Sequence, residues 1–209
     1  ASNNLAVGYE ALKLTTTGPN NVAVGNYNLD SNTTGDGNTA VGYGVMQANT
    51  TGSHNTAVGR NSLNANTTGQ YNIAIGYVAL DACVDGSKNN AIGAFALTNY
   101  DPASSEDSHN NAFGYNALGA TTTGKYNTAV GGNCLDSNTT ADNNTAVGYN
   151  ALTANQTGTG LTAVGKDALK ANTTATNNSA FGRTALYSNT TGGNNTGLGV
   201  NALYINTTG

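Results

Sequence analysis

The chain has 209 residues, of which 95 are Asn, Thr or Gly, while Leu, Ile, Val and Phe together number only 34. This composition excludes a conventional α/β enzyme domain, a helical bundle and a coiled coil, because each needs far more Leu, Glu, Lys or Arg. The net charge is −4, and the 7 basic residues are scattered singly, so we expect no nucleic-acid binding. No apolar run approaches the ~20 residues of a membrane span, and we expect none.

An internal repeat of 17 residues covers the chain as a single array, residues 1–209. Its consensus is N-T-A-V-G-Y-N-A-L-x-A-N-T-T-G-x-x, and we number its positions 1 to 17. One repeat, the sixth, is longer, with a four-residue insertion inside the segment 99–109. The twelve repeats, called coils 1 to 12 from here on, begin at residues 4, 21, 38, 55, 72, 89, 110, 127, 144, 161, 178 and 195.

The positions of the repeat differ in how strictly they are kept. Position 1 is Asn except at Leu161, position 3 is Ala except at Gly197, and position 5 is always Gly. Position 4 is always large and apolar, and position 9 is Leu except at Met46. A unit of 17 residues is too short for a helix pair or a propeller blade, which need roughly 34 and 40 residues.

These features predict an all-β parallel β-solenoid with one repeat per coil. The T-A-V phrase is a short strand stopped by Gly, a second extended stretch follows through Ala and Leu, and N-T-T-G forms a turn. Stacked coils place equal positions about 4.8 Å apart. We therefore expect Val and Leu columns to form a thin core, and Asn columns to form amide ladders.

The orientation of the strand decides which column faces outward. If the large residue at position 4 points inward, alternation turns position 3 outward. An outward column that is almost always Ala indicates close packing of another backbone, and we predict a homotrimer interface there. The alternative is that Ala points into a narrow core and Thr points outward.

Two phrases resemble known fibrous proteins. Residues 39–42 and 178–182 are similar to the S-V-A-I-G phrase of YadA-like heads in trimeric autotransporter adhesins, although the unit here is about three residues longer. Residues 144–152, N-T-A-V-G-Y-N-A-L, more closely resemble repeats of phage tail-fibre and related fibre-like surface proteins. The resemblance implies a left-handed, trimeric β-roll that is extracellular, on a cell surface or on a virion.

No catalytic, cofactor or metal residues are predicted, and we expect no enzyme. His54 and His109 end coils 3 and 6, where we interpret them as solvated turn residues. The insertion gathers acidic residues near Asp81 and Asp85, which favours either a plain surface bulge or a local Ca²⁺ or recognition feature. Cys83 and Cys134 lie three coils apart, beyond the ~7 Å limit of a disulfide, so both are expected to be free.

Three surface columns suggest other roles. Asn-x-Thr/Ser sequons recur in the turns, either as N-glycosylation sites or as by-products of turn chemistry. Adjacent Thr residues at positions 13 and 14 suggest an ice-binding surface, but only one of the two side chains can face outward. Tyr recurs at position 6 as a ladder or as a carbohydrate-stacking surface. These sets are Asn32, Asn49, Asn66, Asn138, Asn143, Asn155, Asn172, Asn177, Asn189, Asn194 and Asn206 for the sequons, and Tyr9, Tyr43, Tyr77, Tyr115 and Tyr149 for the column.

The leading functional hypothesis is a structural fibre or adhesin segment, an extended trimeric rod that attaches to a host or surface through a glycan or protein receptor. The alternative is a self-assembling extracellular filament with a mechanical role, in which coils stack end to end. An ice-binding solenoid is a third hypothesis.

Overall fold

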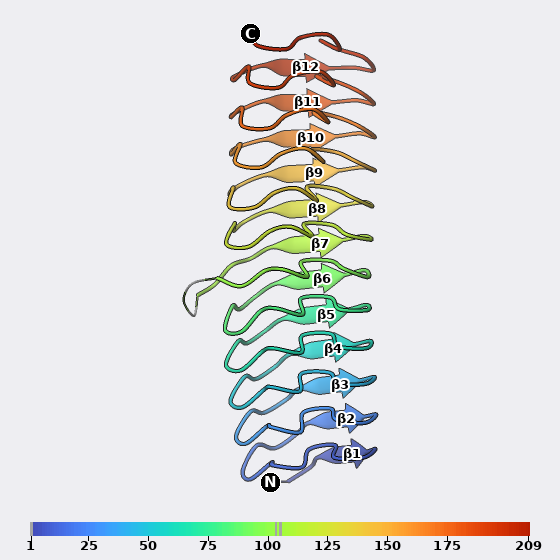
Figure 1. The fold of residues 1–209 in the computed structure, drawn as a ribbon, viewed down its shortest axis with the longest axis vertical. Helices are drawn as coiled ribbons and strands as arrows, with labels where there is room; N and C mark the ends of the chain where they lie inside the picture. Colours follow the sequence, from blue (N-terminus) through green and yellow to red (C-terminus); the bar gives the residue numbers. More distant parts are fainter. Residues whose placement is uncertain (1, 103, 105) are drawn as a thin grey trace. The chain divides into compact units, whose positions relative to one another are not determined.

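The computed structural model describes residues 2–102, 104 and 106–209. The chain is an all-β parallel β-solenoid, and no helix occurs within these described residues. It divides into two compact units, residues 1–109 and 110–209, at the end of the coil that carries the insertion. The repeat therefore folds as predicted, with one strand per coil in each unit (Figure 1).

Every strand has three residues and occupies positions 2 to 4 of its coil. The strands of the first unit are β1 (Leu5–Val7), β2 (Val22–Val24), β3 (Thr39–Val41), β4 (Thr56–Val58), β5 (Ile73–Ile75) and β6 (Asn90–Ile92). Those of the second are β7 (Asn111–Phe113), β8 (Thr128–Val130), β9 (Thr145–Val147), β10 (Thr162–Val164), β11 (Ser179–Phe181) and β12 (Thr196–Leu198).

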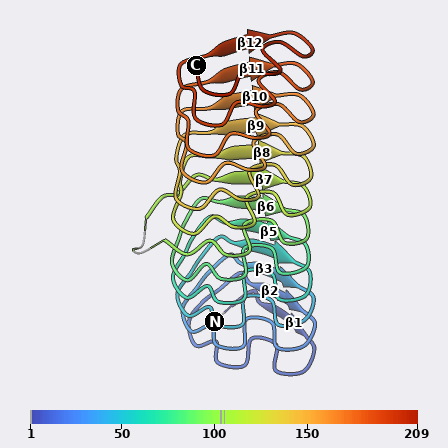
Figure 2. The same cartoon turned by 45° about the horizontal axis from the view of Figure 1, so that its top comes forward.

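Within each unit the strands pair in parallel, in chain order and in register. Thr39 pairs with Thr56, Ala40 with Ala57 and Val41 with Val58, and the other pairs within a unit repeat this one-coil step. The strand arrows of a unit consequently lie above one another and point the same way (Figures 1 and 2). Register of this kind brings chemically equal residues together in columns.

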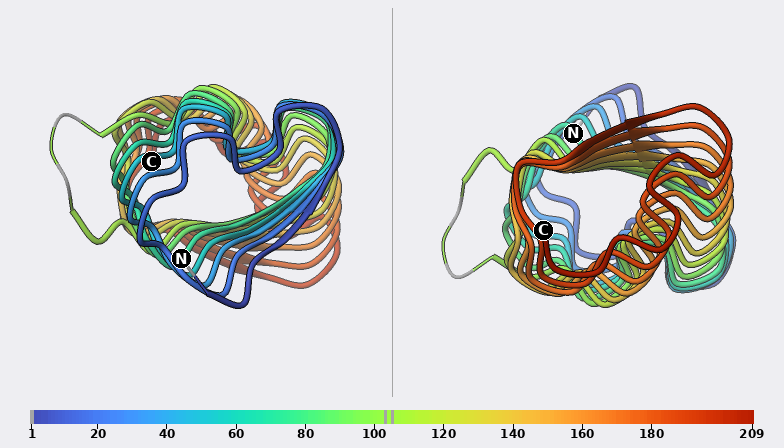
Figure 3. Two further views of the ribbon diagram at one scale, coloured as in Figure 1. Left: turned by 90° about the horizontal axis from the view of Figure 1, so that it is seen from below. Right: turned by 90° about the horizontal axis from the view of Figure 1, so that it is seen from above.

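The glycine at position 5 ends each strand because the chain turns where two coils lie very close. Gly59 has a φ of 124°, and a Cβ added to it would lie 2.6 Å from the carbonyl oxygen of Gly76 in the next coil. Only a residue without a side chain fits both this conformation and this spacing. Views along the stacking direction show how closely the coils of a unit follow one another (Figure 3).

The alanine column at position 3 is the centre of the core, so the predicted outward orientation was wrong. All ten alanines from Ala23 to Ala180 are fully buried within the single chain. The leucine column packs against this position, since a Cβ added at Gly197, the position 3 residue of coil 12, would lie 3.2 Å from Leu186. Leu29, Leu63 and Leu118 of that column are fully buried. Because one coil is so narrow, a large residue at position 3 would meet the leucine from the far side, so Ala fills that space and the larger position 4 turns outward.

The chain after the glycine differs from the predicted second extended stretch. Turns and bends occupy positions 6 to 11 of the coils, and φ is positive at position 9, such as 51° at Leu29 and 50° at Leu63. A bulky residue in this left-handed region is strained. Burial of the leucine and ladder bonds offset that strain, since the Leu29 N–H donates to the Val45 carbonyl of the next coil at 3.1 Å.

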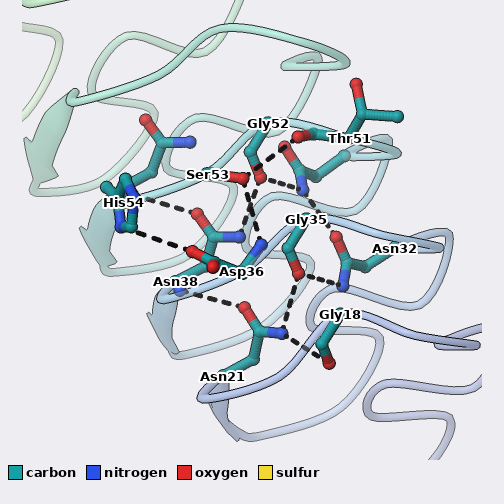
Figure 4. A network of polar contacts seen from close by, with 12 residues as sticks. Gly18, Asn21, Asn32, Gly35, Asp36, Asn38, Thr51, Gly52, Ser53 and His54 are labelled. Carbon is teal, nitrogen blue, oxygen red and sulfur yellow. Dashed lines mark hydrogen bonds and ion pairs between the residues drawn. The ribbon is translucent and has the colours of Figure 1, made fainter. Parts of the chain in front are cut away.

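Two buried asparagine columns join the coils, and Figure 4 shows part of this network. At position 1, the side chain of Asn21 donates to the carbonyl of Gly35 at 2.9 Å and accepts from the N–H of Asn38. At position 12, the side chain of Asn49 donates to Oδ1 of Asn32 at 2.9 Å. The predicted amide ladder is therefore confirmed at position 12, whereas position 1 bonds mainly to backbone.

Candidate interaction surfaces

The outer face of the strands is a neutral stripe, formed in each unit by the residues at positions 2 and 4 of its coils. We call this stripe the strand face from here on. Positions 1 to 5 hold no charged residue in any of the twelve coils. Six large apolar residues of position 4 are 37 to 79 % exposed in the single chain: Val7, Ile75, Phe113, Val130, Phe181 and Leu198. An exposed apolar column on a regular sheet is typical of a surface that binds another molecule.

The tyrosines at position 6 form an exposed column beside the strand face. Tyr9 and Tyr43 are 62 % and 49 % exposed, and both pack edge-to-face against Tyr27, with ring centroids 5.4 and 5.6 Å apart. Tyr77 packs in the same way against Phe95 at 5.4 Å. Desolvation among these rings raises the pKa of Tyr27. The tyrosine column therefore packs against neighbouring rings and is also exposed to solvent.

The two threonine columns have different surroundings. Thr50 at position 13 is half-buried, and its hydroxyl donates to the carbonyl of Thr67 at 3.1 Å. Thr51 at position 14 is exposed. The prediction that only one of the two threonines faces outward is confirmed in this coil, and the same pattern recurs at Thr33 and Thr34.

The sequon asparagines fall into two groups. Seven of those at position 12 are fully buried in the amide ladder, so their amide nitrogens are inaccessible in the folded chain: Asn32, Asn49, Asn66, Asn138, Asn155, Asn172 and Asn189. Asn206 is half-buried in the last coil and donates to Asn189. Asn143, Asn177 and Asn194 at position 17 are exposed. Turn and ladder chemistry thus explains the position 12 motifs.

The two histidines and two cysteines lie apart from one another in the repeat. His54 is an exposed turn residue as expected; its Nδ1 lies 3.4 Å from Oδ1 of Asp36, and its ring stacks on Tyr71 at 5.1 Å. Cys83 and Cys134 are free, as predicted, and the structure buries both. Burial raises the pKa of the Cys83 thiol to about 12 and that of the Cys134 thiol to about 11.

The insertion segment is tied to coil 5 by backbone and side-chain contacts. Ser87 pairs with Asp107 in an isolated parallel bridge, and the ammonium group of Lys88 forms an ion pair with Asp107. Residues 103 and 105 of the segment lie outside the described part of the chain. Among the described residues, no group of three or more His, Cys, Asp or Glu side chains is arranged to hold a metal ion.

A shallow hollow of about 490 Å³ lies in the second unit, lined by Arg183, Thr184, Asn201 and Tyr204. Tyr204 stacks on Tyr187 with centroids 5.0 Å apart and planes 11° apart, and Lys170 lies over the Tyr187 ring at 5.6 Å.

No helix long and apolar enough to cross a membrane occurs in the described part of the chain.

Sequence reasoning missed two features of this surface. The outward apolar column at position 4 was assigned to the core, although the strict smallness of position 3 was a signal that the interior is narrow. Tyr71 and Tyr126 at position 17, which are 54 % and 53 % exposed, carried no periodic signal, because that position varies from coil to coil. Comparison of the chain with protein-family models, curated proteins and solved structures finds no match.

Proposed function

We propose that the protein is a structural fibre or adhesin segment that works as a homotrimer outside the cell, on a cell surface or on a virion. The observation that carries this proposal is the strand face, a neutral stripe whose apolar column is exposed in the single chain. Covering such a column stabilises an assembly by about 25 cal/mol for each Å² of apolar surface removed from water.

The trimer itself is suggested by the resemblance to YadA-like heads and phage tail-fibre repeats, and the strand face replaces the alanine column as its interface. The alanines are already covered by their own chain, so they have no surface to offer a partner. The strand face has no charge that would repel an equal face on another copy. Three chains packed through this face would cover the apolar column that each chain exposes.

Sedimentation equilibrium tests the assembly directly. The proposal predicts a mass three times the 20.9 kDa of the chain. A monodisperse monomer at micromolar concentration would contradict it. Attachment needs a separate measurement, binding of the intact assembly to a glycan array and to host cells; failure of both would leave a mechanical role.

A second candidate is a filament in which coils stack end to end. The last coil exposes Leu198, Val200 and Ile205 by 79, 61 and 82 %. A further coil stacked on this surface, from the same or another chain, would cover these side chains and continue the backbone ladder. Electron microscopy separates the candidates, because filaments many times longer than one chain favour stacking and short particles favour the trimer.

A further inference from the structure

Among coils 2 to 5, which have a neighbouring coil of the first unit on both sides, only coil 5 exposes a large apolar residue at both position 2 and position 4. In β5 both outward residues are large, and Ile73 and Ile75 are each 37 % exposed. Tyr71 and Tyr77 flank the strand and are 54 % and 45 % exposed. We call these four residues the coil 5 patch.

The two tyrosines of the patch are held in place by other rings. Tyr71 stacks on His54 with centroids 5.1 Å apart, and Tyr77 meets Phe95 edge-to-face at 5.4 Å. Rings that are already ordered lose little conformational entropy when a partner binds them. Ordered aromatic side chains around aliphatic ones are the composition of interface hot spots.

The surroundings of the patch have the arrangement of an interface rim. Along the stripe, Ile75 pairs with Val58 on one side and with Ile92 on the other, which extends the apolar column over three coils. Charged groups lie at the two borders of the stripe, with exposed Arg60 at position 6 and Lys88, which pairs with Asp107, at position 17. An apolar centre with a polar rim is the common anatomy of protein interfaces.

We propose that the coil 5 patch is the hot spot through which the strand face binds a second copy of this chain. The stripe is neutral in every coil, so copies of the chain arranged around a symmetry axis bring their strand faces together without charge repulsion. From position 17 to position 6, the face of one unit measures at most about 23 by 29 Å. That footprint, about 670 Å², is comparable with the ~800 Å² per partner of a stable interface. This inference rests on the proposed assembly and names the residues that hold it together.

The test compares two lysine substitutions in the first unit, one inside the patch and one away from the strand face. Ile75→Lys removes the centre of the patch and buries a charge in the contact, whereas Thr51→Lys adds the same charge at position 14, where the threonine side chain is exposed. We expect Ile75→Lys to raise the dissociation constant at least about tenfold, and Thr51→Lys to raise it by less than about threefold. Sedimentation equilibrium measures both, and circular dichroism checks that each variant is folded.

A milder variant protects the test against misfolding. Ile75→Thr keeps the β-branched side-chain shape that Val58 and Ile92 have at the same position of the neighbouring coils. It should raise the dissociation constant by a factor between those of the two lysine variants. An assembled wild type whose dissociation constant is unchanged by either Ile75 substitution would overturn the hot spot while leaving the assembly intact. A monomeric wild type would overturn the assembly itself, and with it a second copy as the occupant of the patch.

Discussion

The backbone N–H of Asn38 donates a 2.9 Å hydrogen bond to Oδ1 of Asn21, the equivalent residue one coil earlier. Both side chains are fully buried. The same contact links Asn55 to Asn38 and Asn72 to Asn55, at 3.0 and 2.9 Å. Each asparagine of this column therefore replaces a water molecule that the adjoining backbone would otherwise need, and it does so inside the protein.

This contact makes Asn55 a sensitive position. Asn55→Leu removes the acceptor of the Asn72 N–H and the donor to the Gly69 carbonyl, both bonds being 2.9 Å long. Leaving such buried groups unpaired should lower the free energy of unfolding by about 2–3 kcal/mol. Leu161→Asn, which restores the consensus at the same position of coil 10, is the matched control and should change stability by less than about 1 kcal/mol. Urea denaturation of both variants measures this; equal stability of Asn55→Leu and wild type would contradict the role assigned to the column.

The burial of the alanine column predicts a folding defect. Ala129 is fully buried, so Ala129→Glu forces a carboxyl group into the apolar core and should destabilise the fold by more than about 3 kcal/mol. Thr128→Glu puts the same group on the outward side of β8 and should retain the fold. Thermal unfolding followed by circular dichroism separates the two. An Ala129→Glu variant that keeps wild-type stability and only dissociates would show that this column faces a partner.

Two glycines offer a contrast in backbone tolerance. Gly59→Ala places a Cβ 2.6 Å from the Gly76 carbonyl oxygen at a φ of 124°, and should lower the free energy of unfolding by about 3 kcal/mol. At Gly132 an added Cβ would lie 3.5 Å from the Tyr149 ring and 4.0 Å from the Tyr115 carbonyl oxygen, both ordinary contact distances. Gly132→Ala should therefore be neutral or stabilising by up to about 1 kcal/mol, because it restricts the unfolded chain. Chemical denaturation checks both, and comparable effects of the two substitutions would argue against the close approach at position 5.

The buried thiols predict a loss of stability in alkaline solution. Burial raises the pKa of Cys83 from 9.0 to about 12, so the folded state keeps the proton that the unfolded state releases first. The stability that this thiol contributes is complete below pH 9 and is lost as the pH rises from 9 toward 12, by up to about 1.4 kcal/mol for each pH unit. Denaturation at several pH values measures the slope.

Cys83→Ala is the control for this pH dependence. This substitution should remove the contribution of Cys83 to the fall in unfolding free energy above pH 9. The contribution of Cys134, whose pKa is raised to about 11, should remain. A slope that is identical in wild type and Cys83→Ala would show that other groups cause the alkaline loss.

Periodicity predicted the architecture because a solenoid repeats its contacts at the same interval as its sequence. The 17-residue spacing placed every strand at T-A-V, and the asparagine at position 12 was recognisable as a ladder such as Asn49 with Asn32. Both the strand positions and the position 12 ladder depend only on contacts between neighbouring coils, which the repeat spacing itself defines.

The amino-acid sequence alone determined the repeat, the strand positions and the glycine that ends each strand. Only the tertiary structure decided which side of the strand is the inside, because Ala129 and Val130 alternate in the same way for either choice. The deciding quantity is the space left inside a coil once the leucine of position 9, such as the fully buried Leu63, is packed there. A narrow coil accepts alanine opposite leucine and turns the larger side chains toward solvent, where they form the surface proposed to bind a partner.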